Sequence, residues 1–432
     1  MHAHDSTKKY GMHYLGIFLF LLFTSVVQAQ QLEQTTPETV GMSSKRLQRL
    51  NTVLENYVEN KQLPGAVVMI SRKGKIAHTA AVGYRDYETK DPIRENTIFR
   101  IASQTKAIVS VGIIMLMEEG KLLLNEPVGN YIPEFNTTTV AVKDGDSYKV
   151  VPAKRKITIQ DLLTHTAGIG YGWGLAHDQW EKAGITGWYF ADRKAPILET
   201  VKLIAQLPQE AQPGEKFVYG YNTDILGALI EVVAQQPLDV FLQQRVLDPL
   251  GMQDTFFYLP SKLSDRLAKV YSPSENGLIA APYGSGAIAQ GDYINGPRKS
   301  FSGGAGYLST ALDYSKFLQM ILNKGVYNNI RILSRKSVEL MLTNHTGDLN
   351  LNEINYPNRQ VFGLGFALRQ SLDKSPSFGS EGELGWGGAY HSVYWADPTE
   401  ELAVVYFTQL IPANDLDDHK KLRNLVYQAI ID

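Results

Sequence analysis

The chain has 432 residues, of which 44% are hydrophobic and 20% are charged, and its formal net charge is −2. This near-neutral balance excludes nucleic acid as the main partner, because phosphate binding needs a basic face. The sequence contains no cysteine, which excludes disulfides, thiol catalysis and a lipid-modified cysteine. A chain of this length can bury a large core, in one big domain or in two closely joined ones.

Residues 1–29 have the pattern of a secretory signal peptide. Two lysines precede an apolar run over residues 14–23, and small residues stand at the positions before a cut after Ala29. A retained membrane anchor is the alternative, although the run is short for a spanning helix, which needs about 20 residues. We therefore expect a secreted or periplasmic protein with no membrane contact after cleavage.

The mature part begins with a helical pattern from about residue 45 to 60. Two strand-like runs over residues 65–86, on either side of Arg72-Lys73-Gly74-Lys75, then predict a hairpin. The run over residues 103–119 is apolar almost all the way round, which is typical of a helix enclosed by other elements. Gly120 follows this run as a natural C-terminal stop.

Residues 125–298 mix amphipathic helices with long connections, and the clearest helix in them has Thr223 or Asp224 as its expected cap. A final amphipathic helix follows three strand-like runs near the C-terminus: "FGLGFALRQ", "AYHSVYWADP" and "ELAVVYFTQL". Strands at both ends with helices between them predict an α/β (α+β) fold, an antiparallel sheet flanked by helices with a mostly helical insert. We expect one catalytic domain over residues 30–432, with sheet-containing parts at 30–124 and 299–432 and the insert at 125–298.

Ser103 and Lys106 stand three residues apart at the start of the apolar helix. Residues with this spacing share one side of a helix, and the backbone N–H groups of a first turn favour a developing oxyanion. A lysine among apolar side chains is costly as a cation, so its neutral amine could take the serine's proton. The alternative interpretation is a helix-capping serine beside a lysine that extends to solvent.

The spacing S-x-x-K is a weak signal by itself, because it occurs at two other places. Ser6 and Lys9 lie in the signal peptide, and Ser371 and Lys374 lie in a polar loop that would not desolvate an amine. The sequence has no G-x-S-x-G, H-E-x-x-H, P-loop or G-x-G-x-x-G motif. The histidines of the mature part show no metal-ligand spacing, so we expect neither a metal nor a cofactor.

The surrounding sequence resembles the serine β-lactamase and penicillin-binding protein superfamily. It is most similar to the branch with class C β-lactamases and β-lactamase-like (family VIII) esterases, through blocks that occur in the same order: "PGAVVMISRKGKI", "IFRIASQTKAIVSVGIIMLMEEGKLLLNEPVGNYIPEF", "ITIQDLLTHTAGI", "PGEKFVYGYNTDILGALIEVV", "LDPLGMQDT", "GGAGYLSTALDYSKFLQMIL" and "FGLGF". This resemblance runs from about Val40 to the C-terminus. It implies a β-lactamase/transpeptidase-like fold and an acyl-enzyme mechanism.

The resemblance implies a nucleophile and a proton shuttle at particular positions. Ser103 takes the place of the acyl-accepting serine, and Lys106 that of the conserved lysine. Tyr219 takes the place of the tyrosine in the Tyr-x-Asn element, whereas Tyr221 stands where the asparagine is expected. The literal Tyr-x-Asn strings lie in the wrong neighbourhoods and are treated as chance matches; they begin at Tyr293, Tyr327 and Tyr356.

The third element of the family is Lys-Thr-Gly or His-Thr-Gly on a strand beside the site. A literal His345-Thr346-Gly347 leads into a polar loop, whereas Trp386-Gly387-Gly388 opens a strand-like run in the expected order. We therefore assign the element to Trp386-Gly387-Gly388, whose glycines let a ligand approach the backbone. The same alignment implies an oxyanion hole made by the backbone N–H groups of Ser103 and Ala389.

The departures from the family pattern predict the kind of substrate. Trp386 supplies no cation for a substrate carboxylate, and Tyr221 removes an amide that could bind a substrate amide. We expect a carboxylic-ester hydrolase in which Lys106 and Tyr219 share acid–base work and Tyr221, Trp386, Gly387 and Gly388 contact a small-molecule ester or amide. The alternatives are a β-lactamase or D-amino-acid peptidase with the same site, and a binding protein that does not turn over substrate.

Overall fold

The structure is a computed structural model that describes residues 2, 32–349, 351, 361–372, 377–413 and 416–432. The predicted signal peptide lies, apart from His2, outside the described residues, as do Lys374 and Tyr356. Within the described residues, no single helix combines the length and apolar character needed to cross a membrane. One pair of segments, Asn222–Ala234 and Leu238–Leu250, passes that test jointly but bends by 83°.

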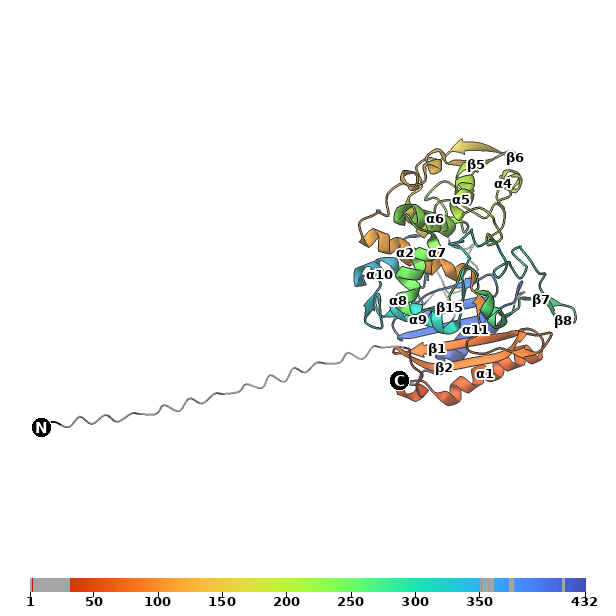
Figure 1. The fold of residues 1–432 in the computed structure, drawn as a ribbon, viewed down its shortest axis with the longest axis vertical. Coiled ribbons are helices and arrows are strands. Elements are labelled where there is room, and N and C mark those ends of the chain that lie inside the picture. The colour runs from red at the N-terminus through yellow and green to blue at the C-terminus, as the bar shows by residue number, and fades with distance from the viewer. Residues whose placement is uncertain (1, 3–31, 350, 352–360, 373–376, 414–415) are drawn as a thin grey trace.

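An eight-stranded antiparallel sheet joins the two ends of the chain (Figure 1). Its order from one edge to the other is β12 (Val361–Phe362), β13 (Ala367–Leu368), β14 (Leu384–Gly388), β15 (Ser392–Asp397), β16 (Leu402–Thr408), β1 (Gly65–Arg72), β2 (Lys75–Asp86) and β3 (Asp91–Pro92). The N-terminal hairpin therefore pairs directly with the last strand, with Val68 opposite Tyr406. The predicted antiparallel sheet built from both chain ends is confirmed.

Residues of β1 are buried on both faces because helices cover both sides of the sheet. Val68 belongs to a core under α1 (Ser44–Glu59) and α11 (Asp418–Tyr427), whereas Val67 belongs to the larger core that contains α9 (Ala311–Leu322). A strand with two covered faces needs a continuous apolar run rather than an alternating one. This explains the unbroken run "GAVVMI" in the sequence.

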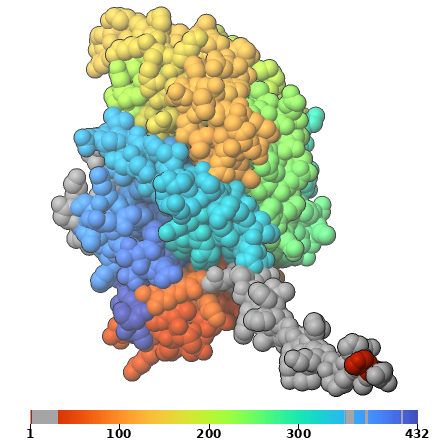
Figure 2. Space-filling model, turned by 90° about the vertical axis from the view of Figure 1, so that its left-hand side faces the viewer, coloured from red at the N-terminus to blue at the C-terminus, as the bar shows by residue number. Residues whose placement is uncertain are grey.

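The middle of the chain forms a second, mainly helical half, which Figure 2 shows at the opposite end from the red and dark blue segments. Its helices are α3 (Ile159–Leu163), α4 (His177–Lys182), α5 (Ile197–Gln206), α6 (Asn222–Ala234), α7 (Leu238–Leu242) and α8 (Asp248–Leu250), with a π-helical turn at Gln243–Leu247. The hairpin of β5 (Thr139–Asp144) with β6 (Ser147–Pro152) belongs to this half. The hairpin of β7 (Tyr271–Ser274) with β8 (Gly277–Ala280) also comes from the middle of the chain but lies beside the sheet, where Tyr271 forms a bridge with Leu410 (Figure 1). Further elements are α10 (Arg335–Met341) and the small pairs β4 (Phe99–Arg100) with β9 (Leu308–Ser309) and β10 (Val326–Tyr327) with β11 (Ile330–Arg331). Short 3-10 turns lie at Pro37–Val40, Val128–Asn130, Pro133–Thr137 and Ser261–Arg266.

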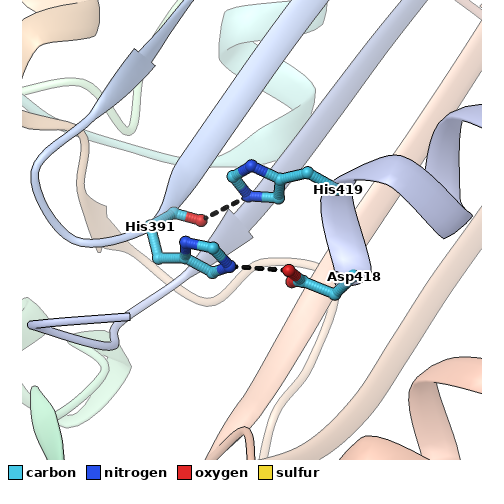
Figure 3. Close-up of side chains that lie close together, drawn as sticks. All are labelled: His391, Asp418 and His419. Carbon is cyan, nitrogen blue, oxygen red and sulfur yellow. Dashed lines mark hydrogen bonds and ion pairs between the residues drawn. The ribbon is translucent and has the colours of Figure 1, made fainter. Parts of the chain in front are cut away.

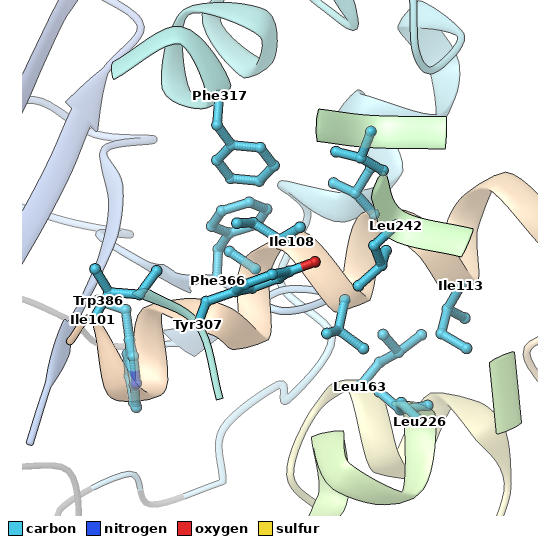
Figure 4. Close-up of a cluster of buried hydrophobic side chains, with 14 of the residues drawn as sticks. Ile101, Ile108, Ile113, Leu163, Leu226, Leu242, Tyr307, Phe317, Phe366 and Trp386 are labelled. Carbon is cyan, nitrogen blue, oxygen red and sulfur yellow. The ribbon is translucent and has the colours of Figure 1, made fainter. Parts of the chain in front are cut away.

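Helix α2 (Thr105–Glu118) connects the two halves. Its buried side chains join Leu163, Leu226 and Leu242 of the insert to Phe317 and Phe366 of the other half in a single core (Figure 4). The predicted enclosed helix is present, but it begins at Thr105 rather than at Ser103, and a short 3-10 turn over Ala102–Gln104 precedes it. Gly120 follows with φ of 67°, a conformation that suits glycine at a helix end.

Three local predictions were wrong. The predicted strand "AYHSVYWADP" begins only at Ser392, and the expected strand "FGLGFALRQ" is two short strands around a turn. The predicted cap of α6 is absent, because Tyr221 occupies the N-cap without a side-chain hydrogen bond. The Asp224 carboxylate instead accepts hydrogen bonds from the loop at Ser302 and Gly304, so it is not available to cap the helix.

Candidate active site

Ser103 is the accessible point of an otherwise buried segment. Pairing of β4 with β9 fixes the approach to the 3-10 turn, and Tyr314 Oη donates a hydrogen bond to the Gln104 carbonyl at 2.9 Å. All residues from 97 to 116 are buried except Ser103, which is half-buried. Ala102 has φ of 42°, a strained conformation for a residue with a Cβ. Such strain collects at functional sites, where the surrounding structure maintains it.

Lys106 lies directly behind this serine. Its Nζ is 3.2 Å from Ser103 Oγ and 3.3 Å from Tyr171 Oη, and it donates a hydrogen bond to the Gly304 carbonyl at 2.6 Å. Lys106 is 3% exposed, and within the described part of the chain no carboxylate oxygen lies within 4 Å of its Nζ. The predicted Ser–Lys pair is therefore brought together, with neutral oxygens as its partners.

Asp224 holds the loop that supplies this carbonyl. The buried carboxylate accepts hydrogen bonds from Ser302 Oγ at 2.6 Å and from the Gly304 N–H at 3.0 Å. A Cβ at position 304 would lie 2.3 Å from Asp224 Oδ2, so the close approach requires glycine. Burial raises the pKa of Asp224, while the Ser302 hydroxyl and the charge of Lys106 lower it. The sequence predicted Thr223 or Asp224 as a helix cap. It did not predict the contacts of Asp224 with Ser302 and Gly304, because only the fold brings that loop to the carboxylate.

Two tyrosines lie over the amine of Lys106. Its Nζ is 4.7 Å from the centre of the Tyr219 ring, and the Tyr219 and Tyr171 rings meet edge to face at 5.7 Å. Burial raises the pKa of the Tyr171 hydroxyl well above its usual range, with further contributions from Tyr219 and Asp224. The sequence motifs did not indicate Tyr171, although it lies only two residues after the end of the block "ITIQDLLTHTAGI".

Histidine and tryptophan side chains support the Tyr219 ring. The His165 ring lies 4.8 Å from it, and burial lowers the pKa of His165 well below its usual range, with the charge of Lys106 adding to the effect. Trp386 Nε1 donates a hydrogen bond to Tyr219 Oη at 3.0 Å. The indole N–H of Trp386 is thus occupied by a tyrosine of the same cluster.

Tyr221 does not line an accessible surface, in contrast to the predicted substrate contact. It is 0% exposed, stacks between Trp180 and Phe190, and donates a hydrogen bond to the Gly187 carbonyl at 2.5 Å. Its ring meets Tyr171 edge to face at 5.0 Å. Tyr221, in the position of the asparagine, therefore packs against Tyr171 from the buried side.

Trp386-Gly387-Gly388 forms the end of strand β14 rather than the start of the next strand. A Cβ at Gly388 would lie 2.6 Å from the Ile101 carbonyl oxygen, so this end of β14 lies against the residues that precede Ser103. Ala389 follows in the turn to β15 and is half-buried. The predicted strand element and the serine are thus neighbours.

The literal His345-Thr346-Gly347 lies elsewhere. It lines a polar pocket of about 560 Å³ together with Arg155 and Asp161. Thr346 Oγ1 accepts a hydrogen bond from the Phe362 N–H, and the Phe362 ring stands between this segment and Trp386. The triplet is not on a strand beside Ser103.

Comparison with known proteins identifies the family of the chain. A family model described as Beta-lactamase matches residues 50–428. The chain belongs to the beta-lactamase family. Its relatives in that family are serine hydrolases, so the cluster around Ser103 is the candidate active site of a serine hydrolase of the beta-lactamase family.

Three relatives illustrate the range of activities in this family. Esterase EstB of Burkholderia gladioli is 31% identical over 377 residues, which cover 83% of this chain and 89% of that protein. A Salmonella typhimurium protein provisionally named as a D-alanyl-D-alanine carboxypeptidase is 28% identical, with 90% and 88% covered. The solved structure of EstCE1, described as a hydrolase with promiscuous acyltransferase activity, superimposes with a TM-score of 0.76 at 26% identity, covering 90% of this chain and 99% of that one.

Proposed function

We propose that this beta-lactamase family protein is a carboxylic-ester hydrolase that works through an acyl-enzyme on Ser103. The observation that carries the proposal is the setting of Lys106: a buried Nζ, without a carboxylate within 4 Å among the described residues, 3.2 Å from the half-buried Ser103 Oγ. An amine that is desolvated and not paired with a carboxylate can accept the hydroxyl proton.

The proposed reaction has two balanced steps. Ser103 Oγ bonds to the ester carbonyl carbon while its proton passes to Lys106 Nζ, and the negative oxygen forms beside the backbone N–H groups of Ser103 and Ala389. The C–O bond to the alcohol then breaks, and the leaving oxygen receives a proton from the Lys106–Tyr219–Tyr171 cluster. Water then attacks the acyl carbon and gives up a proton to the same cluster, the bond between that carbon and Ser103 Oγ breaks, and Oγ takes a proton back from the cluster as the acid leaves.

Neutral acyl groups fit this cluster better than anionic ones. The Tyr219 ring contacts the rings of His165, Tyr171 and Trp386, and Trp386 stands where the family pattern has lysine or histidine. Trp173, 63% exposed, lies 5.8 Å from the Tyr171 ring and offers an apolar surface on the solvent side. Lys106 is the cation of this cluster, and its Nζ already contacts Ser103 Oγ, Tyr171 Oη and the Gly304 carbonyl, so a substrate carboxylate would lose water without gaining a dedicated cation partner. The name of the relative EstB supports the ester assignment.

Amide chemistry at the same site is the second candidate. The Salmonella relative, provisionally named as a D-alanyl-D-alanine carboxypeptidase, favours it. A β-lactamase or D-amino-acid peptidase would use the same acyl-enzyme step on Ser103. A binding protein without turnover is the weakest candidate, because Ser103, Lys106 and Tyr219 are all present.

The test compares hydrolysis of p-nitrophenyl butyrate, a chromogenic cephalosporin and a D-alanyl-D-alanine peptide by wild type and Ser103→Ala. We expect ester turnover by the wild type and a loss of at least about 10³-fold in the variant. Intact mass spectrometry locates the acyl group. Turnover of the lactam or the peptide without esterase activity would overturn the proposal, and failure of every compound to acylate Ser103 would favour the binding protein.

We further propose that the protein is secreted or periplasmic. The support is the signal-peptide pattern of residues 1–29 alone. Mass spectrometry of the protein from fractionated cells should find an N-terminus at Gln30, outside the cytoplasm. An intact residue 1 in a membrane fraction would instead indicate a retained anchor.

A further inference from the structure

The turn that carries Ala389 is held at its buried side by the core. Residues 389–391 connect β14 to β15, and the His391 N–H donates a hydrogen bond to the Gly388 carbonyl at 3.1 Å. Tyr390 is fully buried, and its carbonyl accepts a hydrogen bond from the Leu410 N–H at 3.2 Å. His391 has φ of 63°, in the left-handed region where a side chain is strained. The closing residue of the turn therefore needs support from its surroundings.

Helix α11 supplies that support: its Asp418 and His419 form a cluster with the side chain of His391 (Figure 3). His391 Nε2 lies 2.7 Å from Asp418 Oδ1, and His419 Nε2 lies 3.1 Å from the His391 carbonyl, to which it can only donate. The two imidazole rings stack at 4.0 Å. Tyr406 of β16 donates its hydroxyl to Asp418 Oδ2 at 2.6 Å. Both the side chain and the backbone of His391 are thereby fixed.

The cluster has the composition of a metal site but not its geometry. The ligand atoms of His391, Asp418 and His419 lie within 4.8 Å of one another. The ring planes are only 11° from parallel. Because the nitrogen lone pairs lie in those planes, they do not converge on one ion. Hydrogen bonds within the protein already occupy the facing atoms.

We propose that His391, Asp418 and His419 are positioning residues that fix the Ala389 N–H of the oxyanion hole relative to Ser103. The proposal rests on the proposed acyl-enzyme function. It is argued from the place of the turn: Gly388 lies against the Ile101 carbonyl, two residues before Ser103, and His391 lies two residues after Ala389. Oxyanion donors act over 2.7–3.1 Å and need placement to within about 0.5 Å.

The test measures the rate at which a fluorophosphonate probe labels Ser103, followed by intact mass. This reaction uses the oxyanion hole but does not depend on the natural substrate. His419→Phe keeps the ring stack and removes the donor to the His391 carbonyl, whereas His419→Gln keeps a terminal N–H donor. We expect labelling to be about tenfold slower in the first variant and largely restored in the second. With p-nitrophenyl butyrate, kcat should fall with labelling while KM changes less than about twofold.

His78→Phe is the matched control. His78 lies on β2, is also half-buried, and hydrogen-bonds a helix on this face of the sheet through Asn51 of α1 at 2.8 Å, but it does not touch the turn. Its labelling rate should equal that of the wild type. An equal slowing in His78→Phe and His419→Phe would overturn the proposal, because weaker packing of the helices on this face of the sheet would then explain both results.

Two further outcomes separate this proposal from the proposed function. Unchanged labelling of a folded His419→Phe would show that the cluster does not position the turn. If that variant does not unfold cooperatively, Tyr406→Phe removes only one hydroxyl donor to Asp418, and unchanged labelling there would overturn the proposal equally. Absence of labelling in the wild type itself would refute the acyl-enzyme function on which the proposal rests.

Discussion

At the level of single residues, the amine of Lys106 and the hydroxyl of Ser103 define the chemistry. We predict that Lys106→Met lowers kcat for p-nitrophenyl butyrate by about 10²–10⁴-fold, because no other acceptor replaces the amine. The melting temperature should stay the same or rise, since a buried amine without a carboxylate partner is costly to desolvate.

Lys316→Met is a suitable control for that change. Lys316 is partly buried but pairs with Asp313 at 2.9 Å, so its loss should affect stability and leave kcat unchanged. Retention of more than about a tenth of the activity in Lys106→Met would contradict the assigned role of the amine.

The two tyrosines can be distinguished by the leaving group. If the Tyr219 hydroxyl protonates the departing alcohol, Tyr219→Phe should slow hydrolysis of ethyl butyrate at least about tenfold more than that of p-nitrophenyl butyrate, whose phenolate leaves without help. Tyr171→Phe should show the same bias if Tyr171 shares that proton. Tyr148→Phe, in the β5–β6 hairpin, is the control. An equal fall in the hydrolysis rates of the two esters would show that Tyr219 only packs in the site and does not protonate the leaving group.

Trp386 offers a test of substrate class. We predict that Trp386→His, which restores a residue type of the family pattern and keeps a ring N–H for Tyr219 Oη, shifts the ratio of kcat/KM for a chromogenic cephalosporin to that for p-nitrophenyl butyrate by about tenfold towards the lactam. The physical reason is a polar group for the substrate carboxylate. An unchanged ratio would show that the specificity is determined elsewhere.

Of the site residues, sequence reasoning found those that lie in motifs and missed those that meet only in the folded chain. Ser103 and Lys106 are three residues apart, so local spacing predicts their contact. Tyr171 and Asp224 reach the amine or its loop across 65 residues or more, for which no local pattern exists. The burial of Tyr221 was also unpredictable, because Trp180 and Phe190 approach it only in three dimensions.

At the level of elements, burial patterns predicted the long helices and strands well. The continuous apolar runs that became β1 and α2 are long enough to need cover on every side. Short strands were predicted less well, since β14 contains glycines at 385, 387 and 388 and has little strand propensity of its own. Its pairing with β13 on one side and β15 on the other supplies the order instead.

Helix α2 should be the element most sensitive to lost volume. Ile113 is fully buried where α2 meets the insert (Figure 4). We predict that Ile113→Ala lowers the free energy of unfolding by about 2–5 kcal/mol and Ile113→Val by about 0.5–1.5 kcal/mol. Urea denaturation measures both. A loss below about 1 kcal/mol for Ile113→Ala would show that the surrounding side chains move to fill the cavity left by the substitution.

At the level of the whole molecule, the free energy of unfolding should depend on pH through His419 of α11. Burial lowers the pKa of His419 to about 4, with the charge of His391 adding to the effect. An unfolded histidine takes its proton near pH 6.5, so the stability due to neutral His419 is present above that pH and is lost as pH falls to about 4. The full effect is about 3 kcal/mol.

The measurement is urea unfolding of wild type and His419→Gln between pH 7.5 and 4.5. The wild type should lose more stability over this interval than the variant. The raised pKa values of the buried Asp224 and Asp313 act in the opposite direction in both proteins, so the difference between the two curves is decisive. Parallel curves would refute the assignment to His419.

The pairing of the first long strand with the last one has a consequence for biosynthesis. Residues 65–72 remain without one of their two neighbours until residues 402–408 have been made. A ribosome must therefore release nearly the entire polypeptide before the hairpin can be enclosed, and closing so large a loop is slow. Until then an apolar edge stays open to self-association, which makes the nascent chain a natural client for chaperones.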